Sequence, residues 1–304
     1  MGTRARLAAY ADSREIGLER LERALSELEG ADRELSTWRR DSAVSDFNRA
    51  PLGATWTAGA QLCRMFVSIF AWKEASGGAF DPAIGALVSA WGLHVGGRRP
   101  TGAELARARA QSGLHLVDFN ANACTLTRRA AVTLDVGAFG KGEALDRATA
   151  LLSGTSFLID LGGQVTVGEP GPHGQPWTVD VAHPARRDQL AFSLSVRHGS
   201  VATSGGSERD VVVGGRRVSH ILDPRSGQPS LFDGSVTVWH ERGLAADVLS
   251  TALYVMGPGK GLPWAASRGL SVAFLIPDPE GVRIAETAAF ASLRSGESLT
   301  TAPE

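Results

Sequence analysis

The chain has 304 residues, of which 43% are hydrophobic, so it can bury a large core as one large domain or as two closely packed ones. Its 31 Lys and Arg residues balance 32 Asp and Glu residues, which argues against a global field for nucleic acid or an anionic membrane. No apolar run reaches the roughly 20 residues of a membrane-spanning helix, and the start MGTRARLAAY is not a secretory leader. We therefore expect no transmembrane segment, and either a cytoplasmic location or export through a leader that this sequence lacks.

Helical patterns dominate the first third of the chain. Apolar residues recur at helical spacing over 14–29, and a second helix is predicted over 60–75, before the pair Gly77 and Gly78. A third helix is predicted to begin at Thr101, because Thr101 and Glu104 form a capping box. Residues 114–119 and 124–127 then predict a hairpin. The two cysteines, at positions 63 and 124, are in no metal-binding spacing, and we expect both to be small core residues.

After residue 130 the sequence changes from helical patterns to short runs that are rich in strand-forming residues. The runs that predict strands are 131–136, 156–159, 177–181, 190–196, 210–213, 217–222 and 235–239. Helices are predicted at 142–152 and 244–256 between them. Early helices followed by strands and two further helices predict an α+β fold with mixed, largely antiparallel sheets and flanking helices, rather than a strict βαβ alternation.

Glycine is abundant, with 36 residues against a usual share of about 7%, and it concentrates between Gly137 and Gly234. A ligand site is expected there. The run GAFGKG at 137–142 lacks the spacing and the Ser or Thr of a Walker loop, and GPGKG at 257–261 lacks the Rossmann spacing. No Gly-x-Ser-x-Gly elbow and no pair of histidines at helical ligand spacing is present, which argues against hydrolase triads and zinc sites.

Asp247 and Thr251 stand out in the otherwise apolar stretch LAADVLSTALYVMG, residues 244–257. They are one turn apart and so share a helix face. Carboxylate and hydroxyl oxygens are hard donors that suit Mg²⁺. From this pair alone a structural interpretation is favoured: Asp247 meets the helix dipole, and Thr251 bonds back to the preceding turn.

The stretch LDVGAFGKGEALD, residues 134–146, passes from a strand end at Asp135 through small residues into a helix start at Lys141. The chain has only three lysines, so a lysine here is a compositional exception. A strand end beside a helix N-terminus is a natural anion or nucleotide site. A tight connection with a surface lysine explains the same pattern.

A lone histidine, His220, follows the basic turn GGRRVS in a predicted strand and precedes an Asp223-Pro224 turn. We expect Asp223 to be its orienting partner, if it has one. Most single histidines in strands are structural, so only the residues around His220 make a functional role for it more credible.

In SGGAFDPAIGALVSAWG, residues 76–92, two glycines before Phe80 and Asp81 let the backbone approach a flat ligand. Asp before Pro also simply starts a turn, which is the structural explanation of the same residues.

Taken in order, these segments resemble the FAD:protein FMN transferase family, the ApbE-like flavin transferases. The resemblance spans nearly the whole chain. It is carried by the opening MGT, LSTWRRDSAVSDFNRA (35–50), GGAFDPAIGALVSAWG (77–92), LDVGAFGKGEALD (134–146), FLIDLGGQVTVG (157–168), VATSGGSERDVVVGGRRVSHILDPRSGQP (201–229) and SVTVWHERGLAADVLSTALYVMG (235–257).

The resemblance implies an ApbE-like architecture over 1–304, either a single domain or two closely packed lobes with the flavin site between them. It assigns a set of residues to the flavin nucleotide: Met1, Trp38, Ala79, Phe80, Asp81, Asp135, Lys141 and His220. It implies Mg²⁺ held by the side chains of Asp247 and Thr251 and by a backbone oxygen of Ala138. The catalytic residues it implies are His220, Asp247 and Lys141.

The implied reaction is Mg²⁺-dependent transfer of FMN from FAD to a Thr or Ser hydroxyl of an acceptor flavoprotein, with AMP as the leaving group. The hydroxyl attacks the phosphorus nearer riboflavin, Mg²⁺ and Lys141 stabilise phosphate charge, and His220 accepts the hydroxyl proton. This chain departs from the family pattern at Trp38 and Ser207, where tyrosine is more usual, and at Gln164, where aspartate is common.

Two other functions would use the same residues. One is an Mg²⁺-dependent FAD pyrophosphatase that gives FMN and AMP, with water in place of the protein hydroxyl. The other is a non-catalytic FAD-binding protein. The sequence leaves the acceptor and the oligomeric state open.

Overall fold

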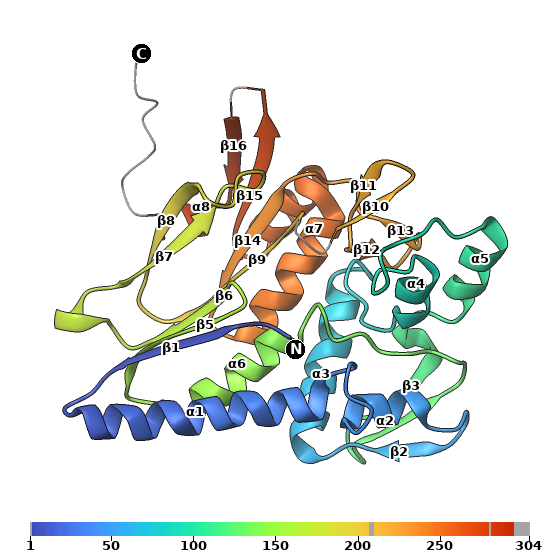
Figure 1. Ribbon diagram of the computed structural model, residues 1–304, viewed down its shortest axis with the longest axis horizontal. Coiled ribbons are helices and arrows are strands. Elements are labelled where there is room, and N and C mark those ends of the chain that lie inside the picture. The colour runs from blue at the N-terminus through green and yellow to red at the C-terminus, as the bar shows by residue number, and fades with distance from the viewer. Residues whose placement is uncertain (1, 207–209, 280, 295–304) are drawn as a thin grey trace. The chain divides into compact units, whose positions relative to one another are not determined.

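The computed structural model describes residues 2–206, 210–279 and 281–294. The chain divides into two compact units. Unit 1 comprises Met1–Ala31, Phe139–Gly206 and Phe232–Glu304, and unit 2 comprises Asp32–Ala138 and Ser207–Leu231. Every strand pair in these segments is antiparallel, and helices flank the sheets (Figure 1), which confirms the predicted α+β fold. None of the helices in these segments is long and apolar enough to cross a membrane.

Unit 1 is built on a seven-stranded sheet with the order β1-β5-β6-β9-β14-β15-β16. Its strands are β1 (Ala5–Tyr10), β5 (Ser156–Leu161), β6 (Gln164–Gly168), β9 (Gly199–Gly205), β14 (Ser235–His240), β15 (Ser271–Asp278) and β16 (Gly281–Glu286). The helices of this unit are most of α1 (Arg14–Leu35), α6 (Gly140–Ala150), α7 (Gly243–Ala266) and α8 (Ala288–Ala291), together with the 3₁₀ turn η2 (Pro172–Gly174). A two-stranded hairpin, β7 (Trp177–Ala182) and β8 (Leu190–Val196), completes it.

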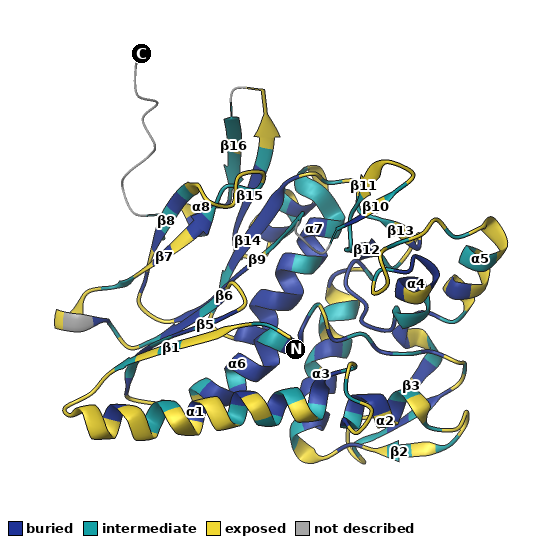
Figure 2. Cartoon of the chain, in the orientation of Figure 1, coloured by how far each residue is buried: buried dark blue, intermediate teal, exposed yellow. Residues whose placement is uncertain are grey.

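The two faces of this sheet are covered by different elements. Neighbouring residues of a strand point to opposite faces. In β9, Val201 packs in an apolar cluster with the β7–β8 hairpin and Phe290 of α8, whereas the Ser204 hydroxyl bonds to Ser250 of α7. Helix α7 therefore lies on the face opposite the hairpin. Figure 2 shows α7 buried along most of its first half.

Unit 2 contains α2 (Ala43–Arg49), α3 (Ala60–Ala75), α4 (Gly85–Ala90), α5 (Gly102–Ala110) and the 3₁₀ turn η1 (Leu114–Leu116). Its sheets are a three-stranded one, β2 (Thr55–Thr57), β4 (Thr125–Arg128) and β3 (Val117–Asn120), and two short hairpins. The hairpins are β10 (Val211–Val213) with β11 (Arg216–Val218), and β12 (Leu222–Asp223) with β13 (Gln228–Pro229). Helix α1 (Arg14–Leu35) runs six residues beyond its predicted end at residue 29.

Several local predictions are confirmed. The helix over 60–75 and the strand over 190–196 have the predicted bounds, and the capping box of Thr101 and Glu104 is present in both directions. Helix α7 continues past its predicted end at 256 because it is broken, not terminated, at Gly257, where φ is 68° and Pro258 follows.

Two predicted strands are wrong. Residues 131–136 form no strand, because their backbone groups bond to irregular partners: the Leu134 N–H to the Asn48 side chain, and the Asp135 N–H to the Pro82 oxygen. The run 217–222 is split between β11 and β12, so His220 lies in the connection rather than in a strand.

The two cysteines form a disulfide, which corrects the expectation of two separate core residues. Cys63 lies in α3 and Cys124 in the turn before β4, 61 positions apart, with their Cα atoms 5.4 Å apart. The bond ties α3 to the β3–β4 hairpin inside unit 2. Disulfides form and persist mainly in oxidising compartments.

Replacing both cysteines with serine should lower the free energy of unfolding by about 4 kcal/mol, because a closed loop of this length restricts the unfolded chain. Urea denaturation of the double variant measures the loss. The wild type in a reducing agent should unfold at the urea concentration that unfolds the variant. Two thiols that react at once in the native, unreduced protein would contradict the bond.

Candidate functional site

Helices α6 and α7 of unit 1 cross at a glycine of each helix, so no side chain separates the two backbones there. A β-carbon added to Gly142 would lie 2.2 Å from the backbone oxygen of Gly243, and one added to Gly243 would lie 2.8 Å from the oxygen of Gly142. Both distances are far shorter than a van der Waals contact, so only glycine at both positions permits this approach. The crossing point is therefore fixed by two glycines 101 positions apart in the sequence.

Helix α6 is capped by a carboxylate from α7. The residue before α6, Phe139, supplies no side-chain cap. Instead the Asp247 Oδ2 atom accepts the Gly142 N–H at 3.1 Å. A carboxylate in this place satisfies an otherwise unpaired amide and meets the positive end of the helix dipole.

Helix α7 is capped in turn by a carboxylate from α6. Its preceding residue, Arg242, supplies no side-chain cap, and Asp146 accepts the N–H groups of Gly243 and Leu244. Arg242 adds an ion pair to Asp146 at 3.4 Å. Burial raises the pKa of the Asp146 carboxyl, although these hydrogen bonds and the Arg242 charge oppose the rise. Asp146 was not among the predicted site residues, since a cap from a distant helix has no local signal.

Lys141 also meets Asp247. Its Nζ atom lies 2.9 Å from Asp247 Oδ1, and the Asp247 side chain is only 5% exposed. One turn along α7, the Thr251 hydroxyl donates to the Asp247 carbonyl at 3.2 Å and lies 3.4 Å from the Ser204 hydroxyl of β9. Lys141 and Asp247 thus meet at the N-terminus of α6, and Thr251, one turn further along α7, completes a cluster of three polar residues. The structural alternative is confirmed for Thr251, whose hydroxyl bonds back to the Asp247 carbonyl, but Asp247 caps α6 and not its own helix. The metal-binding interpretation stays a prediction.

The oxygens of this cluster fit Mg²⁺ in kind. Both are hard donors, and each Asp247 oxygen keeps lone-pair capacity beyond the N–H group that it accepts. Within residues 2–206, 210–279 and 281–294, however, no three His, Cys, Asp or Glu side chains gather as a metal site. The formal charge of Asp247 is already balanced by Lys141, so a dication would need further anionic ligands. The third predicted ligand, Ala138, ends unit 2, and the next residue begins unit 1.

His220 is held by Asp210, not by Asp223. The Asp210 Oδ1 atom lies 2.7 Å from His220 Nδ1 and 3.0 Å from the backbone nitrogen of His220. Asp223 instead pairs with both the Nε and an Nη atom of Arg225 at 2.9 Å. The predicted orienting role of Asp223 is therefore wrong. The glycine pair at 214–215, typical of a tight hairpin, was the signal that places Asp210 next to His220.

The predicted flavin residues 79–81 are buried in unit 2. Ala79 and Phe80 are each 1% exposed, and Asp81 is 6% exposed. The Asp81 carboxylate accepts the N–H groups of Ala83 and Leu114, so it ties the start of α4 to η1. Burial raises the pKa of this carboxyl, and the two amide donors oppose the rise. The visible role of Asp81 is to hold backbone, and its contact with flavin stays a prediction.

Trp38 and Asp135 flank a histidine that the sequence did not single out. The Trp38 ring is 69% exposed and lies 4.5 Å from the His94 ring, centroid to centroid. His94 Nε2 lies 3.7 Å from Asp135 Oδ2, and Asp135 Oδ1 accepts the Gly137 N–H at 2.8 Å. An exposed indole supported by a second ring suits stacking against a flat ligand.

The predicted residues are distributed over both units. Lys141, Asp247 and Thr251 lie together in unit 1. The remaining predicted residues in the described segments belong to unit 2: Trp38, Ala79, Phe80, Asp81, Asp135, Ala138 and His220. Met1 and Ser207 lie outside the described residues.

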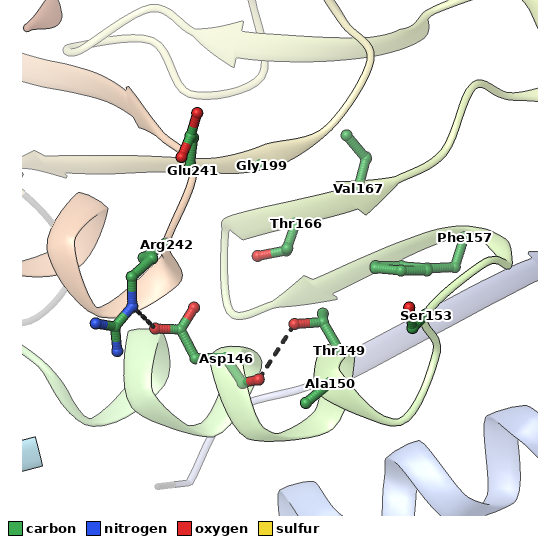
Figure 3. A pocket seen from close by; sticks show the side chains of 10 residues that line it. All are labelled: Asp146, Thr149, Ala150, Ser153, Phe157, Thr166, Val167, Gly199, Glu241 and Arg242. Atoms are coloured by element: carbon green, nitrogen blue, oxygen red, sulfur yellow. Dashed lines mark hydrogen bonds and ion pairs between the residues drawn. The ribbon is translucent and has the colours of Figure 1, made fainter. Parts of the chain in front are cut away.

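Gln164, one of the departures from the family pattern, supports the N-terminus of α7. Its Nε2 atom donates to the Gly243 carbonyl at 2.9 Å and to the Ser200 hydroxyl at 3.1 Å. An aspartate could not donate to that carbonyl. A cleft of about 540 Å³ is lined by ten residues of unit 1 (Figure 3), including Asp146 and Arg242. Lys141, Asp247 and Thr251 are not among its lining residues.

Comparisons with known proteins agree on one family. The model of the ApbE family matches residues 1–275. A FAD:protein FMN transferase of Klebsiella pneumoniae (strain 342) is 29% identical over 283 residues, which cover 90% of this chain and 81% of that protein. One of Treponema pallidum (strain Nichols) is 32% identical over 281 residues, 85% of this chain and 77% of that protein.

Solved structures show the same likeness. The ApbE protein of Thermotoga maritima superposes with a TM-score of 0.88 at 27% identity, over 97% of this chain and 96% of that one. The apo form of the Pseudomonas stutzeri flavinyl transferase ApbE gives a TM-score of 0.80 at 28% identity, over 96% and 97% of the two chains.

Substituting Gly142 with alanine should lower the free energy of unfolding by about 1–3 kcal/mol, because the new methyl group forces α6 and α7 apart. Gly259→Ala is the matched control: Gly259 lies in the last part of α7, and a β-carbon there meets no atom within 4 Å. Urea denaturation compares the two. Equal stability of both variants would contradict the close crossing.

Proposed function

The chain belongs to the ApbE family and is a transferase, and we propose that it moves FMN from FAD to a threonine or serine hydroxyl of an acceptor flavoprotein, with Mg²⁺ as the metal ion. The family and the names of the relatives support the FMN transfer itself. The metal ion, the hydroxyl acceptor and the roles of the individual residues are what we propose.

The observation that carries the proposal is the cluster at the α6 N-terminus. Lys141 and a helix N-terminus attract an anion, while the Asp247 carboxylate and the Thr251 hydroxyl attract a hard cation. A site that attracts both an anion and a hard cation suits an anionic diphosphate that carries a divalent metal ion. FAD has such a diphosphate at its centre.

We assign a role in the reaction to each of three side chains. Lys141 supplies a positive charge to the phosphate oxygens. His220 takes the proton of the acceptor hydroxyl while the new oxygen–phosphorus bond forms and the phosphorus–oxygen bond to AMP breaks, so AMP leaves with the bridging oxygen. Trp38 offers its exposed face to the isoalloxazine ring.

Asp247, Thr251 and the Ala138 carbonyl would hold the metal ion. When bound, Mg²⁺ would stabilise negative charge on the phosphate oxygens. Lys141 Nζ now lies 2.9 Å from Asp247 Oδ1, and we expect it to move away if a dication binds this carboxylate, because like charges repel. The side chain would then be released toward the phosphates whose charge it is to balance.

The direct test is to incubate the protein with FAD, MgCl₂ and candidate acceptor flavoproteins, and to weigh the acceptors by mass spectrometry. We expect an added FMN-phosphoryl group on a threonine or serine, with one AMP released per acceptor. FMN and AMP in solution with no modified acceptor would identify a pyrophosphatase instead. FAD that stays intact with acceptor and metal present would contradict both activities.

Replacing Asp247 with asparagine should slow transfer by at least about 100-fold, because the only carboxylate of the cluster is lost. It should also cost about 1–3 kcal/mol of stability, because Lys141 loses its partner. Adding Lys141→Met to Asp247→Asn should restore part of this stability but none of the activity.

Lys260→Met, a change of an exposed lysine on α7, is the matched control and should leave transfer unchanged. Single-turnover rates and urea denaturation measure the two effects separately. Transfer by Asp247→Asn at the wild-type rate would remove the cluster from the reaction.

A further inference from the structure

Asp210 is a buried carboxylate that contacts three donors. Its Oδ1 atom lies 2.7 Å from His220 Nδ1 and 3.0 Å from the His220 backbone nitrogen, and its Oδ2 atom accepts the Arg217 Nε–H at 2.9 Å. The Asp210 side chain is 5% exposed, whereas that of Arg217 is 57% exposed. A carboxylate buried in this way needs the donors it has.

The β10–β11 hairpin places Asp210 beside His220. Val211 pairs with Val218 in this hairpin, so residue 210 falls opposite residue 219, next to His220. The two-residue turn Gly214–Gly215 has φ values of 59° and 77°, which glycine adopts without strain and which set the register of a tight hairpin. The hairpin itself packs on Gly97, where a β-carbon would lie 2.5 Å from Val211.

The chemistry of the pair dictates where the histidine proton lies. Burial alone would raise the pKa of the Asp210 carboxyl, but the side-chain and backbone hydrogen bonds of His220 and the charges of His220 and Arg217 lower it below its usual value. The carboxylate is therefore ionised near neutral pH and only accepts hydrogen bonds. The hydrogen between Oδ1 and Nδ1 must then sit on Nδ1.

We propose that Asp210 is a positioning residue that fixes the tautomer and the orientation of His220, so that the Nε2 atom carries the lone pair that accepts the acceptor hydroxyl's proton. The second bond from Oδ1, to the His220 backbone N–H, ties the ring to its own main chain and fixes its direction. Arg217 keeps the proton off Asp210. This inference rests on the proposed function of His220 as the base, and it adds the two residues that prepare that base.

The charged groups around His220 agree with this role. Asp210 and Arg217 come from the two arms of the hairpin. The nearest carboxylate on the other side in sequence, Asp223, is engaged by the Arg225 side chain and by the Arg225 backbone N–H at 2.9 Å. Among the described residues, Asp210 is thus the carboxylate that is hydrogen-bonded to the His220 ring.

Asparagine at position 210 makes a specific test. In either orientation its amide group would point a donor at a donor, either at Arg217 Nε–H or at the His220 N–H groups. We expect Asp210→Asn to lower the single-turnover transfer rate at pH 7 by at least about tenfold, which is a part of the 10²–10⁴-fold that a general base contributes. The limb of the pH–rate profile that rises with pH should move to lower pH, because a protonated imidazole loses its counter-charge.

A second variant separates positioning from a general structural effect. In Asp210→Asn combined with Arg217→Leu, the amide nitrogen can turn to the place left by the guanidinium, so the oxygen again accepts from both His220 N–H groups. Part of the lost rate should return in this double variant. A purely structural role predicts the opposite, since two damaging changes would then add. Arg216→Gln, a change of the exposed neighbour of Arg217 in β11, should keep the wild-type rate.

Nitrogen-15 NMR of labelled histidine in the wild-type protein tests the inference without any catalytic assay. The account requires the His220 signals of the neutral ring to show a protonated Nδ1 and an unprotonated Nε2. The reverse tautomer, or a wild-type rate in Asp210→Asn with an unchanged pH profile, would overturn it. If the wild type transfers no FMN to any acceptor but the tautomer is as stated, the proposed function fails while the Asp210–His220 arrangement stands.

Discussion

The contact between Gly142 and Gly243 is the constraint from which the geometry of the α6 N-terminus follows. Because the two backbones touch there, the start of each helix lies within reach of a carboxylate on the other. Asp247 must then lie at the α6 N-terminus, and Lys141, the residue before Gly142, must lie at Asp247. One backbone contact therefore determines where a cation, a carboxylate and a helix dipole meet. Neither helix has a cap of its own, so crossing and capping depend on each other.

Both units use a buried carboxylate to hold a side chain to which we assign a role in the proposed reaction. In unit 1, Asp247 holds the Lys141 ammonium group, and in unit 2, Asp210 holds the His220 imidazole. The Asp247–Lys141 pair and the Asp210–His220 pair differ in the chemistry that they suit. The Asp247 pair is electrically neutral, so it suits a metal ion and a diphosphate that arrive together. The Asp210 pair keeps its proton on Nδ1, so it suits a base. Trp38, supported by His94, adds an exposed aromatic face.

The sequence predicted what local rules determine. The helix over 60–75, the capping box at Thr101 and the shared face of Asp247 and Thr251 follow from periodicity and spacing alone. It did not predict β9, a central strand, because GSVATSG is small and polar and owes its strand to its two neighbours. It also missed Asp146 and Asp210. Both act through contacts between segments, and only the Gly214–Gly215 turn gave a local signal for the second.

The central claim is that Asp247 and Thr251 hold a metal ion that displaces Lys141. Anomalous diffraction from crystals grown with FAD and Mn²⁺, a substitute for Mg²⁺, tests it most directly. The account predicts a manganese peak within about 2.5 Å of an Asp247 carboxylate oxygen and of the Thr251 hydroxyl, with Lys141 Nζ moved from Asp247 to a phosphate oxygen. Bound FAD with no manganese at Asp247, or with the Lys141–Asp247 pair still in contact, would contradict it.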